Sequence, residues 1–383
     1  MKILLHIGQS KTGTSAIQAF LMLNSRRLRE AGILYPSVSV GGFNVDFGNH
    51  NPVADALAGV STYPHLTADQ YFAQFFETAR RFHAERMILS AEHFFGGEPR
   101  VWDVPDMETY EARYRRKILA LACNLEGHEV SVLVYLRPQV DWLASAVGQA
   151  VRLERMIGKT VYENDRQFFE SWKPLLRYAR LLECWADVLQ PHVLTAVPYV
   201  REKLYRKSSI ADFLRRTELD HLDFPLANSQ WDVNQSLTRE YIEVKKRLNK
   251  QPNSKNVERV TIACLNRLSR QSTMGTSYRL DEDVVRDIEA FVADDNQKLT
   301  QDYGGGEHVF VARKAYKGNK LPPLSEGDIE EATALFRRTY RNPRTRLLTV
   351  NYAARAFLRR HAPTVHAALH QIKRAFWRMK YRW

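Results

Sequence analysis

A lysine, two glycines and four small hydroxyl residues lie close together in the stretch HIGQSKTGTSAIQAFL, residues 6–21. The apolar run before it, residues 2–5, predicts a strand, and apolar residues at helical spacing predict a helix from Ser15 onward. Gly32 stands where this helix should end. The N–H groups at the amino end of a helix attract negative charge, and the lysine adds a cation. The stretch therefore predicts an anion-binding loop between a strand and a helix.

This loop differs from the phosphate loop of nucleotide triphosphatases, whose pattern is G-x-x-x-x-G-K-[ST]. Gly8 and Gly13 have the spacing of the two glycines, but Thr14 stands where the lysine should follow. The lysine of this chain is Lys11, inside the loop. Such a loop can bind an oxyanion, but it lacks the arrangement that puts a lysine on a triphosphate and a hydroxyl on magnesium.

Predicted strands alternate with predicted helices along the first 200 residues. This alternation is typical of an α/β fold with a parallel sheet flanked by helices. Residues 203–301 read as mostly helical. The predicted strands are residues 2–5, 33–35, 87–89, 130–136 and 192–197, and the predicted helices include 15–31, 67–79, 110–124 and 140–155.

Polar side chains follow three of these strands, and ligands of open parallel sheets bind beyond the carboxyl ends of the strands. Lys11 follows the first strand, Glu92 and His93 follow the strand at 87–89, and Arg137 follows the strand at 130–136. Ser145 comes eight residues after Arg137. We expect these groups to converge on one edge of the sheet, where they would bind an anion at two points.

Residues 6–36 and the stretch LVYLRPQVDWLASA at 133–146 resemble the sulfotransferase family, and specifically its bacterial carbohydrate-type branch. The resemblance implies a P-loop nucleotide-kinase-like fold and 3′-phosphoadenosine 5′-phosphosulfate (PAPS) as sulfuryl donor. It implies no metal. The R-x-G-x-x-G ending of the aryl-type members is not found, so the adenine contacts stay unassigned. By resemblance the 5′-phosphosulfate would bind Lys11, Thr12, Gly13, Thr14 and Ser15, and the 3′-phosphate would bind Arg137 and Ser145.

The acceptor implied by the resemblance is a hydroxyl of a polysaccharide, lipopolysaccharide or glycolipid. Glu92 occupies the place of the carbohydrate branch's glutamate and is the expected general base. His93 and His50 are alternative bases or acceptor contacts. Two other classes stay open. One is a nucleotide or small-molecule kinase, for which no magnesium-binding acid is evident; the other is a non-catalytic glycan- or membrane-binding protein.

The net charge of +13 is concentrated at the carboxyl end of the 383-residue chain. Residues 337–383 hold eleven arginines, two lysines and no acid, and the rest of the chain has 43 basic and 43 acidic residues. We therefore divide the chain into a catalytic domain, 1–331, and a helical basic amphipathic tail, 332–383. Apolar residues from Val365 to Met379 form one stripe along that tail. Such a helix can lie on an anionic membrane, bind an acidic glycan or pack on the catalytic body. No nucleic-acid motif accompanies the charge.

The three cysteines have no C-x-x-C spacing, which favours reduced thiols over a zinc site. No stretch of eighteen apolar residues occurs, and the first apolar run is too short for a signal peptide. These observations predict a cytoplasmic protein whose tail can reach the inner face of the membrane.

Overall fold

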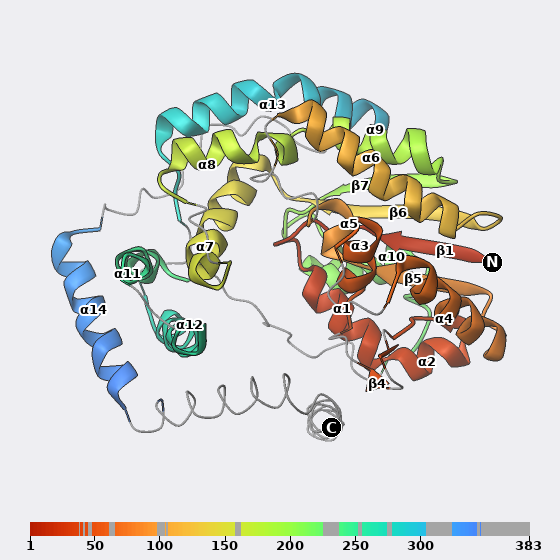
Figure 1. The fold of residues 1–383 in the computed structure, drawn as a ribbon, viewed down its shortest axis with the longest axis horizontal. Coiled ribbons are helices and arrows are strands. Elements are labelled where there is room, and N and C mark those ends of the chain that lie inside the picture. The colour runs from red at the N-terminus through yellow and green to blue at the C-terminus, as the bar shows by residue number, and fades with distance from the viewer. Residues whose placement is uncertain are drawn as a thin grey trace. The chain divides into compact units, whose positions relative to one another are not determined.

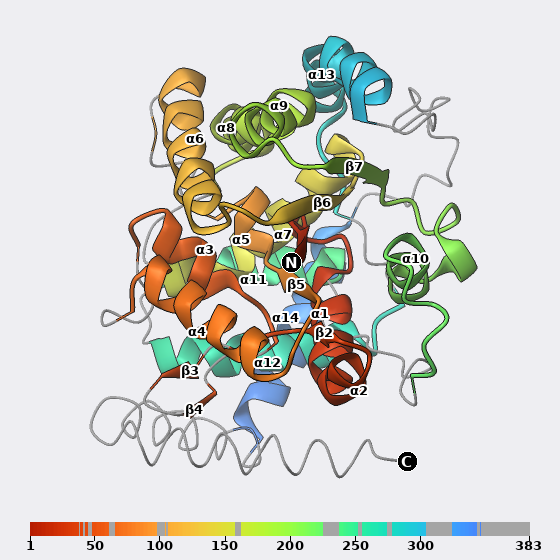
Figure 2. The ribbon, with the colours of Figure 1, turned by 90° about the vertical axis from the view of Figure 1, so that its right-hand side faces the viewer.

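The computed structural model describes residues 1–345 apart from 38, 41–42, 45–47, 61–65, 98–103, 105, 158–161, 225–236, 252–254, 274–277, 304–323 and 343–344. Figures 1 and 2 show the elements from two directions. Their order is β1 (Lys2–His6), α1 (Thr14–Leu23), α2 (Ser25–Glu30), β2 (Ile33–Leu34), β3 (Ser39–Val40), β4 (Phe43–Asn44), α3 (Asn51–Leu57), α4 (Ala68–Arg81), β5 (Arg86–Ser90), α5 (Glu92–Phe95), α6 (Met107–Asn124), β6 (Glu129–Leu136), α7 (Gln139–Ile157), α8 (Asp165–Trp172), η2 (Lys173–Leu176), α9 (Tyr178–Leu189), β7 (Val193–Pro198), η3 (Tyr205–Lys207), α10 (Ser209–Arg216), α11 (Arg239–Asn249), α12 (Lys255–Ser269), α13 (Glu282–Tyr303) and α14 (Glu326–Arg341).

Five strands form one parallel sheet in the order β2-β5-β1-β6-β7. The central strand β1 pairs with β5 on one side and with β6 on the other, so that His6 lies between Ser90 and Leu133. Strands buried on both faces are apolar along most of their length, and VSVLVYL in β6, with one serine among its residues, is such a run. The predicted α/β fold with a parallel sheet is confirmed.

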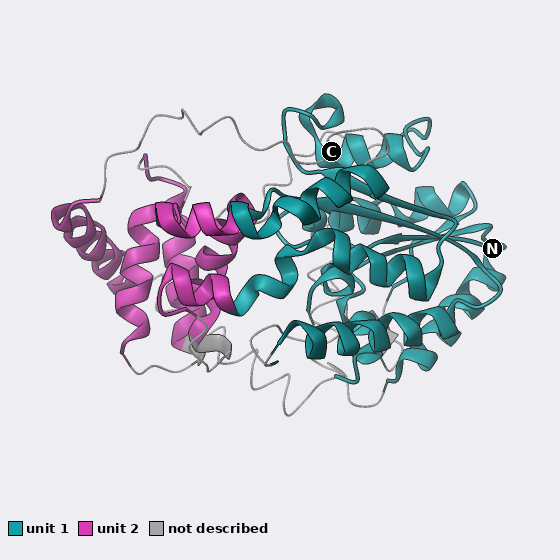
Figure 3. Cartoon of the chain, turned by 90° about the horizontal axis from the view of Figure 1, so that it is seen from above, with its two compact units in different colours: residues 1–139, 171–233, 289–311 teal, residues 140–170, 234–288, 312–383 magenta. Residues whose placement is uncertain are grey.

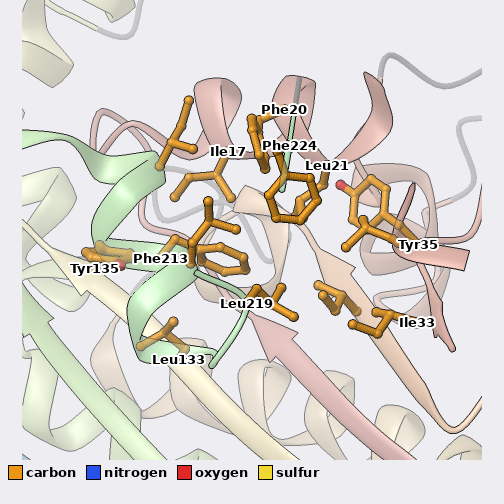
Figure 4. Packing of buried hydrophobic residues seen from close by; sticks show 14 of the residues in the cluster. Ile17, Phe20, Leu21, Ile33, Tyr35, Leu133, Tyr135, Phe213, Leu219 and Phe224 are labelled. Atoms are coloured by element: carbon orange, nitrogen blue, oxygen red, sulfur yellow. The ribbon is translucent and has the colours of Figure 1, made fainter. Parts of the chain in front are cut away.

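Helices cover both faces of this sheet. α6 and α9 pack together on one face, where Trp185 Nε1 donates a hydrogen bond of 2.8 Å to the hydroxyl of Tyr114 (Figures 1 and 2). α1, α2 and α10 lie on the other face over a continuous apolar cluster (Figure 4). Burial of these side chains fixes α1, and with it the loop that precedes α1. The cluster includes Ile17, Phe20, Leu21, Ile33, Leu133, Tyr135, Phe213 and Phe224.

The strand order places a topological switch point between β1 and β6. From β1 the chain moves outward through α1 and α2 to the edge strand β2, and from β6 it moves to the opposite edge strand, β7. Ligands of open α/β sheets bind at such a point, beyond the carboxyl ends of the strands. The chain leaves β1 at the loop with Lys11 and leaves β6 at Arg137.

The chain forms two compact units, coloured separately in Figure 3. The first comprises residues 1–139, 171–233 and 289–311 and holds the parallel sheet. The second comprises residues 140–170, 234–288 and 312–383, and its described elements are helical. In the second unit α11, α12 and α14 pack together around a buried ion pair of 2.7 Å between Lys245 and Glu258. Both units contain parts of residues 1–331, so the division between the units differs from the predicted domain boundary at residue 331. That boundary stays a prediction.

Most predicted elements are confirmed; the helix predicted over 67–79, for example, is α4, which begins with a capping box of Thr67 and Gln70. One difference concerns the first helix, which the sequence predicts as continuous up to Gly32. The structure divides it at Asn24, whose side-chain amide donates to the carbonyl of Phe20 and separates α1 from α2. Residues 346–383, with the apolar stripe of the basic tail, lie outside the described residues. Within the described part of the chain, no helix is both long enough and apolar enough to cross a membrane.

Candidate functional site

The loop between β1 and α1 is tightly folded, and its glycines are required by their surroundings. A Cβ atom at Gly8 would lie 2.4 Å from Oγ1 of Thr14, so no larger residue fits there without moving that side chain. Gly13, which precedes α1, has φ +78°, and Lys11 has φ +69°. A lysine in the left-handed region is under backbone strain, which proteins retain mainly at functional sites. The predicted anion-binding loop thus has an unusual, fixed backbone.

Two hydroxyl groups of this loop bind the loop itself. The Oγ1 atoms of Thr12 and Thr14 donate to the carbonyl of Gln9, at 2.6 and 3.2 Å. Both side chains are buried, whereas Lys11 and Ser15 are partly exposed. Gly13, the residue before α1, has no side chain that could cap this helix, and the first N–H groups of the helix have no acceptor inside it. These N–H groups, Lys11 and Ser15 are therefore the groups best placed to meet an anion.

Glu92 contacts this loop from the neighbouring strand. It is the first residue of α5, directly after β5, and Ser15 Oγ donates to its Oε1 at 3.3 Å. Burial raises the pKa of the Glu92 carboxyl above its usual value, while His93, the Ser15 hydrogen bond and Lys11 lower it and only partly compensate. A raised pKa makes the carboxylate a stronger proton acceptor, which is the property that a general base beside a cationic loop needs.

His93 is held in place on several sides. Its Nδ1 lies 2.6 Å from Oδ1 of Asp55 on α3, and its backbone N–H donates to Oδ1 of Asn51. A Cβ atom at Gly97 would lie 2.7 Å from Cβ of His93, so this glycine permits the close approach. An Nδ1–H donated to Asp55 leaves the lone pair on Nε2, where it can accept a proton or bind a hydroxyl.

His50 has a different environment. Its Nδ1 accepts from the backbone N–H of Ser90 at 3.0 Å, and its Nε2 donates to the carbonyl of Pro36 at 3.0 Å. The ring is buried and lies edge-on to Tyr35. Since main-chain groups occupy both ring nitrogens, this geometry favours a structural role over the predicted role as a base.

His6 is a core residue. Its Nδ1 lies 2.8 Å from Oγ of Ser90, and complete burial lowers its pKa to about 3. The imidazole is therefore neutral in the folded protein.

Arg137 is connected to the loop by three hydrogen bonds. Its backbone N–H donates to Oε1 of Gln9 at 2.8 Å, Nε2 of Gln9 donates to the hydroxyl of Tyr178, and that hydroxyl donates to the carbonyl of Arg137. Gln9 thus ties the end of β6 to the loop after β1, two residues from Lys11. This is the proximity that two ends of one anionic ligand would require.

Two residues near the loop were not predicted as part of the site. A Cβ atom at Gly13 would lie 2.8 Å from Oγ of Ser209 and 3.1 Å from the hydroxyl of Tyr199. Burial raises the pKa of the Tyr199 hydroxyl, and Arg137 and Arg201 oppose that shift, so both guanidinium groups are near it. Tyr199 directly follows β7, and the rule used for the other strands would have found it.

Ser145 belongs to the second unit, on α7, whereas Arg137 belongs to the first. The pairing of these two residues on a 3′-phosphate stays a prediction. The structure brings together Lys11, Thr12, Gly13, Thr14 and Ser15 of the loop, the backbone of Arg137, and Glu92.

Comparison of the chain with protein-family models, with curated proteins and with solved structures finds no match. Within the described residues, no three His, Cys, Asp or Glu side chains are grouped so that they could hold a metal ion.

Proposed function

We propose that this protein is a sulfotransferase that transfers the sulfuryl group of PAPS to a hydroxyl of a carbohydrate. The observation that carries the proposal is the hydrogen bond between Ser15 and Glu92, because it joins a lysine-bearing loop to a partly buried carboxylate. The loop after the central strand and the switch point beside it also fit the P-loop nucleotide-kinase-like sulfotransferase fold implied by the sequence.

The donor would lie across the switch point. Lys11, the hydroxyl of Ser15 and the N–H groups at the start of α1 would bind its 5′-phosphosulfate. The guanidinium of Arg137 would bind its 3′-phosphate, because a guanidinium fork matches the oxygens of a phosphate dianion. Tyr199 is close to both Gly13 and Arg137 and would contact the nucleotide between the two phosphates.

The transfer step is an in-line displacement at sulfur. The acceptor oxygen forms the new O–S bond as the bond from sulfur to the phosphate oxygen breaks, and Glu92 takes the hydroxyl proton. Lys11 stabilises the negative charge that develops on the departing phosphate oxygen. The products are the sulfate ester, 3′,5′-bisphosphoadenosine and the proton now on Glu92.

The experiment that tests donor binding is thermal unfolding with 3′,5′-bisphosphoadenosine or with ATP and magnesium. We expect a rise in melting temperature with the bisphosphate and little with ATP and magnesium. Lys11→Ala should abolish the response. Lys2→Ala is the control, since Lys2 is an exposed lysine on the strand that leads into the same loop. An unchanged response in Lys11→Ala, or a larger response to ATP and magnesium, would contradict the proposal.

A second measurement separates an enzyme from a binding protein. The protein is incubated with sulfur-labelled PAPS and a panel of glycans, and label transferred to glycan is counted. We expect transfer that depends on Lys11. Donor binding without transfer to any glycan of the host would instead indicate the non-catalytic alternative.

A further inference from the structure

A partly open cavity of about 580 Å³ lies in the first unit between the end of α3 and the middle of α6. This volume is within the range of small-molecule sites, which is roughly 300–1,000 Å³. One wall is small and mostly apolar, and the other wall is cationic. The lining residues are Leu57, Ala58, Gly59 and Val60 on one side and Arg113, Arg116 and Lys117 on the other.

The two arginines of the cationic wall are exposed. Within the described part of the chain, no carboxylate lies within 4.0 Å of the guanidinium group of Arg113 or of Arg116. Arg115 does not line the cavity and forms ion pairs with Glu111 and Asp187, each at 3.0 Å. Positions 113, 116 and 117 share one face of a helix. α6 therefore turns Arg113 and Arg116, which have no carboxylate partner among the described residues, toward the cavity, and turns Arg115, which has two, elsewhere.

One residue that lines the cavity, Lys117, contacts the segment that carries Glu92 and His93. Lys117 is buried, and its Nζ donates to the carbonyls of His93 and Gly96, at 3.0 and 3.1 Å. α3, which ends at the cavity, carries Asp55, the partner of His93. A ligand in the cavity would therefore contact the two elements that hold His93, the residue next to the candidate base Glu92.

We propose that this cavity binds an acidic group, a carboxylate or a sulfate ester, carried by the acceptor glycan. This inference rests on the proposed function and specifies its acceptor class as an acidic glycan. Arg113 and Arg116 would bind the acidic group, while the apolar wall from Leu57 to Val60 would contact the C–H face of a sugar ring. A concave site with one apolar wall fits a sugar residue better than a flat lipid surface.

The test is titration calorimetry with an alginate tetrasaccharide, which is a chain of uronic acids, and with the neutral maltotetraose, in the presence of 3′,5′-bisphosphoadenosine. We expect tenfold or tighter binding of the acidic chain. The double variant Arg113→Ala, Arg116→Ala should lose at least tenfold in that affinity and keep its bisphosphate response. Arg115→Ala, from the same helix, is the matched control and should bind the acidic chain as the unmodified protein does.

Three results would overturn the inference. They are unchanged alginate affinity in the double variant, competition by inorganic sulfate at equal concentration, and phosphatidylserine vesicle binding that the double variant loses while alginate does not bind. Failure of the proposed function is seen separately, because it would remove the bisphosphate response of the unmodified protein.

Discussion

The two halves of the candidate site are built in different ways. The loop of residues 8–15 is held in its conformation by its own main chain. Two threonine hydroxyls donate hydrogen bonds to the carbonyl of Gln9, and Gly8 and Gly13 allow close contacts. The segment of residues 92–97 is held by side chains from other elements, since Asn51, Asp55 and Lys117 form hydrogen bonds with His93. The first half is a local structure that can bind an anion, and the second is assembled from distant parts of the chain.

The largest expected effect is on the rate of transfer, from a substitution in the segment of residues 92–97 that leaves the loop of residues 8–15 unchanged. Glu92→Gln keeps the shape of the side chain but removes the group that accepts the proton. We expect transfer to fall by about 10²–10⁴-fold, which is the usual contribution of a general base. The bisphosphate response in thermal unfolding should stay close to that of the unmodified protein, because the donor is bound by the other half.

His93→Gln is the matched comparison, since His93 is the neighbouring alternative. If Glu92 is the base, His93→Gln should reduce transfer less than Glu92→Gln does. The reverse order, with Glu92→Gln nearly as active as the unmodified protein, would assign the proton transfer to His93 and Asp55. Both rates are measured with the same labelled donor and glycan.

The local half of the site was predictable from the sequence, and so was the sheet. Apolar runs identify β1, β5, β6 and β7, and the polar residue after each strand is read directly. Strand order cannot be read in this way, because it depends on packing between distant segments. The ring of hydrogen bonds among Gln9, Arg137 and Tyr178 spans up to 169 residues of chain and has no local pattern.

The histidines show the same limit. His50 and His93 both lie in polar stretches that precede or begin short helices, and the sequence gives them equal standing as bases. Their hydrogen-bond partners separate them: main-chain groups of Ser90 and Pro36 for His50, and the carboxylate of Asp55 for His93. Those partners lie 14 to 40 residues away in the chain, beyond any helical or strand period.

A second prediction tests whether the loop of residues 8–15 depends on the close contacts that its glycines allow. Gly13 and Gly32 have similar φ values, +78° and +72°, but only Gly13 has neighbours within 4 Å of an added Cβ. Gly32→Ala should cost roughly 1–2 kcal/mol of stability from backbone conformation alone. Gly13→Ala should cost about 1–3 kcal/mol more, because Cβ of Ser209 on α10 is fixed by its own backbone.

Unfolding in urea gives both free energies, and bisphosphate affinity provides a second measurement. Gly13→Ala should weaken the affinity, whereas Gly32→Ala should leave it unchanged. Equal stability losses in the two variants would mean that contact with Ser209 and Tyr199 does not constrain the loop.

The smallest expected effect is on the pH dependence of the free energy of unfolding, and it comes from Glu92 in the segment of residues 92–97. Because burial raises the pKa of Glu92 above 4.5, the folded protein binds this proton more tightly than the unfolded chain does. The contribution of Glu92 to stability therefore declines as pH rises from about 4.5 to its raised pKa. The glutamine of Glu92→Gln cannot titrate, so the free energy of unfolding of this variant should increase relative to that of the unmodified protein over this pH window. Above the window the difference between the two free energies should stay constant.

Comparing Glu92→Gln with the unmodified protein also cancels the effect of the titration of His6 on stability. His6, with a pKa near 3 in the folded state against 6.5 when exposed, destabilises the protein as pH falls below 6.5. That contribution has the opposite slope, but it is present in both proteins and cancels in the difference. A difference that stays flat between pH 4 and 8 would show that the carboxyl of Glu92 is hydrated like a surface acid. The burial that raises its pKa, and with it the physical basis for its strength as a base, would then be absent.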